Sequence, residues 1–161
     1  MKTKKWANAF WNEDFYSIKT YSGLGLIGSD PSGAQHLLAA EATDDKLGAA
    51  LLDALSKSRE LTLDEYGEFF NYEKREIEYG KWVALMKEKY AYKTKKALFR
   101  VMRSCAVTLD GEMLEIDPSR HEQLEAWSGT GIKESDKVII PSNSSEAEIG
   151  AALRLAFSRC R

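Results

Sequence analysis

The chain has 161 residues and a formal net charge of -2, with 43% hydrophobic and 30% charged residues. These proportions are ordinary for a soluble globular protein, and the length suits one domain with a substantial core. No apolar run approaches the roughly 18 residues that suggest a membrane span, and the N-terminal segment is too polar for a signal peptide. We therefore expect a cytoplasmic protein that does not engage a membrane.

The N-terminal half is predicted to begin with an aromatic-rich hairpin, whose strands cover residues 6–11 and 15–21. Gly23 and Gly25 mark a tight turn after the second strand, because glycine adopts backbone angles closed to other residues. Residues 35–40 are predicted to form a further strand. The start of the chain is therefore expected to be mostly β-structure.

The middle of the chain is predicted to be helical and densely charged. Thr62 and Glu65 have the spacing of a capping box, so a short helix should run from there to about Phe70. A longer helix should follow, with large apolar side chains at intervals of three and four along one face. That face comprises Tyr72, Tyr79, Trp82, Val83, Met86 and Tyr90. Residues 94–102 are predicted to form another short helix.

The clearest hairpin signal is the Asp-Gly pair at residues 110–111, which suits a two-residue type I′ turn. With that turn, Leu109 opposes Glu112 and Val107 opposes Leu114. One face of this hairpin is then mostly apolar and should be buried.

After the hairpin, residues 118–121 are predicted to open a loop or short helix that leads to Trp127. Residues 137–140 should form a strand, which Pro141 ends. Ser144 or Ser145 is a natural N-cap for the final helix.

Two stretches of the chain repeat one pattern, an aromatic residue followed by Ser-Gly-x-Gly and an aliphatic residue. The pattern occupies residues 21–26 and 127–132, and Ser-Asp follows each copy at the same distance. The helices that come next also match, with Gly-Ala-Ala at residues 48–50 and 150–152. The first of them is predicted over residues 43–59, with Asp44 as its N-cap. We expect the two helices to pack together through these small residues.

The predicted fold class is α+β, a largely antiparallel sheet with hairpins and packed helices. Two copies are too few for a solenoid, so we predict a single domain over residues 1–161 with an internal pseudo-repeat. Its half-repeats would cover roughly residues 2–59 and 93–161, joined by a helical segment at 62–90.

No motif in the sequence specifies an enzyme. His36 and His121 could perform acid–base chemistry in a hydrolase, but neither lies in a motif that imposes such a role. Cys105 and Cys160 match no metal-ligand spacing, so we expect free thiols, no metal and no cofactor. The basic stretch 87–103 could contact nucleic acid, although the pI near 5.8 argues against that as the main role.

The chain resembles the CdiI-type immunity proteins of bacterial contact-dependent growth inhibition systems along nearly its whole length. The resemblance is carried by residues 22–23, 25–27, 29–33, 93–99, 118–122, 124–129 and 148–160. It implies a cytosolic binder, without catalytic activity, that caps the toxic C-terminal domain of a partner CdiA exoprotein in a one-to-one complex. Toxins of this kind are commonly nucleases, and the resemblance identifies no binding residues in this chain.

A nuclease inhibitor gains association rate and specificity by presenting acidic groups, since nucleases bind polyanions through basic clefts. The acidic helical segment is therefore our candidate toxin-binding site. Its predicted contact residues are Glu65, Glu68, Tyr72, Glu73, Glu76 and Glu78. Two alternatives remain open, a nucleic-acid-binding module that uses residues 87–103 and a small hydrolase that uses His36 and His121.

Overall fold

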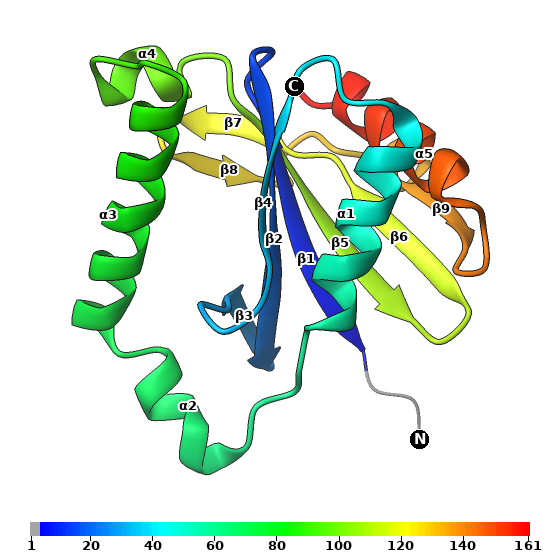
Figure 1. Cartoon of the computed structure of the whole chain (residues 1–161). Helices are drawn as coiled ribbons and strands as arrows, with labels where there is room; N and C mark the ends of the chain where they lie inside the picture. Colours follow the sequence, from blue (N-terminus) through cyan, green and yellow to red (C-terminus); the bar gives the residue numbers. More distant parts are fainter. Residues whose placement is uncertain (1–3) are drawn as a thin grey trace.

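The computed structural model describes residues 4–161, which form an antiparallel seven-stranded sheet with helices on both faces (Figure 1). The strands are β1 (Lys5–Trp11), β2 (Phe15–Leu24), β3 (Leu26–Ser29), β4 (Gln35–Ala39), β5 (Arg103–Asp110), β6 (Met113–Asp117) and β9 (Val138–Pro141). A separate two-stranded hairpin consists of β7 (Arg120–Gln123) and β8 (Ala126–Ser128). The helices are α1 (Asp44–Ser56), α2 (Leu63–Phe69), α3 (Tyr72–Lys89), α4 (Lys95–Phe99) and α5 (Glu146–Ser158), with a 3-10 turn η1 (Glu134–Asp136).

The sheet order is β3-β2-β1-β5-β6-β9, and β4 pairs with the same edge of β2 as β3 does. The prediction of an antiparallel α+β fold is confirmed. Both predicted N-terminal strands and the strand near residues 35–40 are present, and β2 is longer than expected. None of the helices within residues 4–161 is long and apolar enough to cross a membrane.

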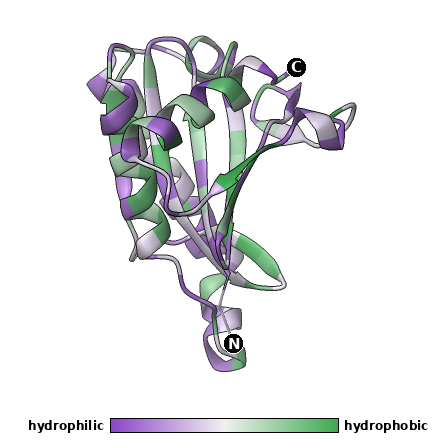
Figure 2. Cartoon of the chain, turned by 90° about the vertical axis from the view of Figure 1, so that its right-hand side faces the viewer, coloured by the Kyte–Doolittle hydropathy of each residue, from purple (hydrophilic) through white to green (hydrophobic). Residues whose placement is uncertain are grey.

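Side-chain alternation along the strands divides the core into two layers. Ala9 and Ile18 lie on the face covered by α1 and α5, whereas Phe10 and Phe15 pack under α3 and α4. The side view in Figure 2 shows the helical layer formed by α1 and α5 on one side of the strands. Successive side chains of a strand point to opposite faces of the sheet, and helices cover both faces. Strands β1 and β2 therefore carry apolar side chains on both faces.

Helices α1 and α5 lie side by side across the sheet. A Cβ atom on Gly48 would lie 1.8 Å from the Glu146 carbonyl oxygen, and one on Gly150 would lie 1.8 Å from the Asp44 carbonyl oxygen. Only glycine permits main chains to approach this closely. The predicted packing of the two helices through their small residues is confirmed.

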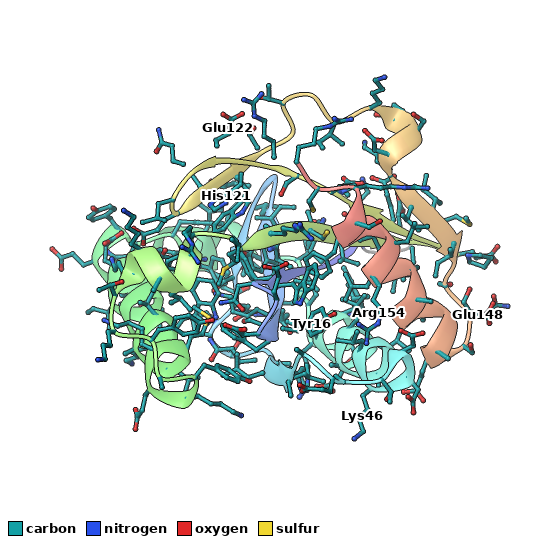
Figure 3. All side chains as sticks on the ribbon, turned by 90° about the horizontal axis from the view of Figure 1, so that it is seen from above. Tyr16, Lys46, His121, Glu122, Glu148 and Arg154 are labelled. Carbon is teal, nitrogen blue, oxygen red and sulfur yellow. The ribbon has the colours of Figure 1, made fainter. Side chains whose placement is uncertain are left out.

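The Arg154 side chain of α5 hydrogen-bonds to both α1 and strand β2. Its Nε atom donates to Asp44 Oδ1 at 2.6 Å, and its Nη1 atom donates to Tyr16 Oη at 2.8 Å. Seen from above, the side chain reaches from α5 toward Tyr16 (Figure 3). The guanidinium also donates to the Ala42 carbonyl oxygen, so one side chain joins α5, α1 and β2.

The ends of the two sequence repeats also correspond in structure. Gly25 and Gly131 share a φ of 79°, which explains why both copies carry glycine there. The Arg59 side chain pairs with Asp30 at 2.9 Å, and Arg161 pairs with Asp136 at 3.7 Å. The strand environments differ, because β2 belongs to the main sheet whereas β8 pairs only with β7. The boundaries of the two half-repeats stay a prediction.

Two predictions about helix α1 need adjustment. Thr43, not Asp44, occupies the N-cap position of α1, and the helix ends at Ser56. It stops there because the Ser58 hydroxyl turns back to accept from Trp6 N and to donate to the Tyr21 carbonyl oxygen. The capping box at Thr62 and the N-cap at Ser145 are confirmed.

The predicted register of the β5–β6 hairpin is wrong by two residues. Leu109 pairs with Leu114, and Asp110 pairs with Met113. The connecting residues are Gly111 and Glu112, so Gly111 takes the first central position with a φ of 64° while Asp110 stays in the strand. A shift of two preserves the side-chain faces, and Leu114 is therefore buried as expected.

Residues 118–127 were expected to form a loop or short helix, and they form the β7–β8 hairpin instead. The His121 ring stacks on the Trp127 ring, with centroids 5.0 Å apart and planes 8° from parallel. His121 N also donates to the carbonyl oxygen of Arg161 at 3.0 Å. These contacts come from the opposite strand and from the C-terminus, so local sequence patterns do not report them.

Candidate partner-binding site

A cavity that we call the α3 cleft lies between α3, the β1–β2 face and the β7–β8 hairpin. Its volume is about 400 Å³, and its lining includes Asn8, Lys19, Arg75, Trp82 and Trp127. Two smaller hollows adjoin it and share Asn8 as a lining residue. Together they make a continuous concave surface on the sheet face opposite α1 and α5, which is the kind of surface that a partner can occupy.

Aromatic rings form the apolar wall of the α3 cleft. The Phe10 and Trp82 ring centroids are 4.8 Å apart, and the edge of Trp127 meets Phe10 at 5.5 Å. Trp82 Nε1 donates to the Ser17 hydroxyl and Trp127 Nε1 donates to the Met102 carbonyl oxygen, so both indoles are fixed. Rigid aromatic side chains of this kind are favourable material for an interface.

Lys19 brings a positive charge into this apolar wall. It extends from β2 and is only 6% exposed, with its Nζ atom 3.7 Å from the centroid of the Trp82 ring. Burial, together with the neighbouring charge of Arg75, lowers the pKa of the ammonium group from 10.5 to about 7. Contact with the ring face compensates part of the lost hydration.

Arg75 is the second cation of the α3 cleft and links α3 to β3. Its Nη1 atom donates to the Ser29 carbonyl oxygen at 2.6 Å, and its guanidinium carbon lies 4.3 Å from the centroid of the Phe69 ring. The Nε and Nη2 atoms are buried without a hydrogen-bond partner among the described residues. Burial consequently lowers the pKa of this guanidinium.

Acidic side chains stand at the rim of the α3 cleft. Glu125 accepts from the Tyr79 hydroxyl at 2.7 Å and pairs with Lys95 at 3.5 Å. Burial and this carboxylate together raise the pKa of Tyr79. Glu76 and Glu78 also line the cleft from α3. The rim is therefore negative and the interior positive, a charge arrangement that the sequence does not reveal.

Asp117 lines the adjoining hollow next to the β7–β8 hairpin. Burial, a hydrogen bond to Glu115 and the charge of that carboxylate raise its pKa from 3.8 to about 7. Its Oδ1 atom has no hydrogen-bond partner among the residues that the structure describes. A carboxyl group that is partly protonated near neutral pH thus lies on the same concave surface.

The structure separates the predicted acidic residues into two groups. Glu65 serves the Thr62 capping box and pairs with Arg59, while Glu68 pairs with Lys74 and Glu78 with Lys81. The other group is exposed on α3, and no ion pair within residues 4–161 engages it. Its members are Tyr72, Glu73 and Glu76. Tyr72 is 75% exposed, so it does not lie on the packed face of α3 as expected.

His36 and His121 are not brought together. His36 Nε2 lies 2.8 Å from Asp53 Oδ2 on α1, whereas His121 Nε2 lies 2.8 Å from the Leu124 carbonyl oxygen in the hairpin. Each ring therefore has its own structural partner. No group of three or more His, Cys, Asp or Glu side chains in the described part of the chain could hold a metal ion.

The basic stretch 87–103 uses its aromatic residues inside the fold. Tyr90 stacks on Phe15 with centroids 4.1 Å apart, and Phe99 is fully buried. Tyr92 donates its hydroxyl hydrogen to Asp14. None of these three rings is available as a stacking platform for nucleic-acid bases.

Sequence analysis missed Lys19, Asn8 and Arg75 as possible site residues. One signal was present, because Lys19 is the single charged residue in the strand 15–21. A lysine in the middle of a sheet strand must either reach solvent or line a cavity. Its position in the α3 cleft depends on α3, which is distant in sequence.

Comparison with known proteins assigns this chain to a family. The model of the CdiI family, described as CDI immunity protein, matches residues 5–160. The chain belongs to the CdiI family of CDI immunity proteins. It is 41% identical to the immunity protein CdiI-YPIII of Yersinia pseudotuberculosis serotype O:3 (strain YPIII), over 97% of this chain and 95% of that one.

Solved structures extend this family assignment to the complete fold. A chain of the CdiA-CT/CdiI toxin and immunity complex from Yersinia pseudotuberculosis matches with a TM-score of 0.91 and 39% identity, covering 99% of both chains. A protein of unknown function from Neisseria meningitidis matches with a TM-score of 0.92 and 39% identity, covering 100% of this chain and 98% of that one. The resemblance inferred from the sequence is therefore confirmed.

Proposed function

We propose that this CdiI protein binds and neutralises the toxic C-terminal domain of a cognate CdiA exoprotein. The observation that carries the proposal is the end-to-end match to a chain of the CdiA-CT/CdiI complex, at a TM-score of 0.91. Because the match covers 99% of both chains, the two proteins share the complete fold. The protein acts in the cytoplasm of the cell that makes it, as a one-to-one binder without a reaction of its own.

The toxin in this proposal is a nuclease, which the immunity protein keeps from its substrate. Nucleases engage the phosphate backbone through basic clefts, and an inhibitor competes for the same charges. Exposed Glu73 and Glu76 lie on α3 beside the α3 cleft, where they can meet such a surface. Interfacial charge of this kind mainly accelerates association and selects the partner.

The acidic face proposed for binding is narrower than the sequence suggested. Glu65, Glu68 and Glu78 already pair with basic side chains of the same protein. The toxin could pair with them only if those ion pairs broke. Exposed pairs of this type contribute little free energy, so they can rearrange at small cost. We place Tyr72, Glu73 and Glu76 at the centre of the contact.

The two other functions have less structural support. A hydrolase would need His36 and His121 to act on one substrate, but they are engaged with different elements. A nucleic-acid module would need exposed rings in the stretch 87–103, where Tyr90 and Phe99 instead pack in the core.

Co-expression with the adjacent toxin domain tests the proposal most directly. The two proteins should purify as an equimolar complex, and the toxin's activity should be lost in that complex and restored after separation. The purified CdiI protein alone should show no hydrolytic activity, and His36→Ala with His121→Ala should protect cells as well as the wild type. A toxin domain that neither binds this protein nor loses activity in its presence would contradict the proposal.

A further inference from the structure

Lys19 is a buried cation without an acceptor in the described part of the chain. Its side chain lies against Phe10 and Trp82, with the Nζ atom 5.7 and 3.7 Å from the centroids of these rings. Burying an ammonium group without a counter-ion is unfavourable. Proteins place such a group where something else completes its environment, and here it borders a cavity of about 400 Å³.

The rim acids do not supply the missing counter-ion. Glu125 is held by Tyr79 and Lys95, and Glu78 pairs with Lys81. The charge that acts on Lys19 is that of Arg75, a second cation. The interior of the α3 cleft is therefore positive and lined by fixed aromatic rings.

We propose that the α3 cleft receives the carboxylate of an Asp or Glu side chain that projects from the partner protein, with the Lys19 ammonium group as its ion-pair partner. This inference rests on the proposed function, since the partner is the toxin domain. The aromatic wall of Phe10, Trp82 and Trp127 would hold the aliphatic part of the inserted side chain.

The acidic rim makes the arrangement selective. A uniformly acidic surface would be repelled by Glu76, which no ion pair among the described residues neutralises, before it reached Lys19. A basic partner surface that carries one projecting carboxylate would attract the acidic rim and would also supply the negative charge that pairs with Lys19. The α3 cleft thus recognises a pattern of charges, and the exposed acidic residues of α3 belong to the same interface as the cleft.

The test compares Lys19→Met with Lys46→Met in the full chain, by calorimetric titration with the toxin domain. Methionine keeps the length and the packing over Trp82 but removes the charge. Lys46 is exposed on α1, on the far side of the sheet (Figure 3). We expect Lys19→Met to weaken binding by about 30-fold or more, because a desolvated charge pair is broken. Its free form should melt at the same temperature as the wild type or higher.

Proton uptake provides a second readout that needs no variant. Lys19 is mostly neutral at pH 8 in the free protein, and a carboxylate beside it would raise its pKa, so binding should take up protons. Titration in two buffers of different ionisation enthalpy measures this uptake, which Lys19→Met should abolish. The other ionisable groups that line the α3 cleft with Lys19 are Tyr21, Arg75, Glu76, Glu78, Tyr79 and Glu125.

The outcomes separate the inference from the proposed function. A wild-type protein that does not bind the toxin domain overturns both. A wild-type protein that binds without proton uptake, or a Lys19→Met variant that binds as tightly as Lys46→Met, overturns the ion pair and leaves the proposed function standing. Loss of affinity and of proton uptake in Lys19→Met alone supports the carboxylate.

Discussion

Gly48 of α1 and Gly150 of α5 occupy equivalent positions in one reciprocal contact. Each lies against the carbonyl oxygen of a first-turn residue of the other helix, Glu146 for Gly48 and Asp44 for Gly150. Each of those residues precedes the partner glycine by four positions, so the contact has local two-fold symmetry. The repeat in the sequence therefore has a physical cause at this point, because two main chains can approach this closely only through glycine.

Adding a methyl group at either glycine should separate the helices. A Cβ atom 1.8 Å from a backbone oxygen cannot be accommodated by side-chain movement. We expect Gly48→Ala or Gly150→Ala to lower the free energy of unfolding by about 2–4 kcal/mol, as overpacked cores do when the main chain must shift. Chemical denaturation with urea measures the change.

Gly80 in α3 provides the matched control, because an added Cβ would have no heavy atom within 4 Å. Gly80→Ala should raise the free energy of unfolding by about 0.5–1 kcal/mol, since alanine is the better helix former. Equal effects at Gly48 and Gly80 would contradict the close approach of α1 and α5.

Local patterns predicted the elements whose determinants lie within a few residues. The capping box at Thr62, the N-cap at Ser145 and the helices that they start are examples. The β5–β6 hairpin was also expected, but Asp110 remains in the strand and the turn moves by one residue toward Glu112. A register is decided by pairing along whole strands, which a dipeptide signal cannot specify.

The candidate site was harder to predict, because distant segments form it. The β7–β8 hairpin depends on the stacking of His121 with Trp127 and on main-chain pairing with Arg161. Lys19 acquires its surroundings from Trp82 and Arg75, more than 50 residues away. The acidic residues, by contrast, were visible as a run of charge, but their pairing with nearby lysines and arginines was not.

Asp117 should make stability depend on pH. Its pKa is about 7 in the fold and 3.8 in a model peptide, so the folded chain binds the proton more tightly than the unfolded chain. The stability that this contributes is full below pH 4 and is lost as the pH rises through 7. We expect Asp117→Asn to raise the melting temperature by about 3 °C at pH 8. The difference from the wild type should disappear below pH 4.

Asp110 is an exposed carboxylate on the neighbouring strand that provides the control for this experiment. Asp110→Asn should leave the pH profile of the melting temperature unchanged. An Asp117→Asn profile parallel to that of the wild type from pH 4 to 8 would show that Asp117 does not titrate in this range.

Cys105 and Cys160 should form an intrachain disulfide under mild oxidation. Both thiols are free, and their Sγ atoms lie 3.7 Å apart although 55 residues separate them. The hydrogen bond with Cys105 lowers the pKa of Cys160 to about 7, so thiolate is present at neutral pH, whereas burial raises the pKa of Cys105. Diamide should accept the two thiol hydrogens as the bond forms, and intact-mass analysis without reductant should record their loss.

Cys160→Ser should prevent this reaction, and the oxidised wild type should stay monomeric. Two thiols that still react with an alkylating agent after denaturation of the diamide-treated protein would contradict the proximity of the two sulfur atoms.

The acidic face of α3 should control how fast the toxin domain associates. Glu73 and Glu76 are exposed, and no ion pair in the described part of the chain neutralises them. Charges of this kind steer a basic partner over a distance that salt shortens. We expect the double variant Glu73→Lys with Glu76→Lys to slow association by about tenfold at low salt. The dissociation rate should change less, because exposed charges contribute little once the complex has formed.

The matched control reverses two acids on the α1–α5 side, Glu41 and Glu146, which changes the net charge by the same amount. Stopped-flow association measured over a range of salt concentrations distinguishes a local effect from one of net charge. The salt dependence should decrease strongly in the α3 variant and only slightly in the control, because the control charges are far from a partner bound at the α3 cleft. If the association rates of the two variants depended equally on salt concentration, the interface would lie away from Glu73 and Glu76. The loops around Asp30 and Trp127 would then be the next surface to test.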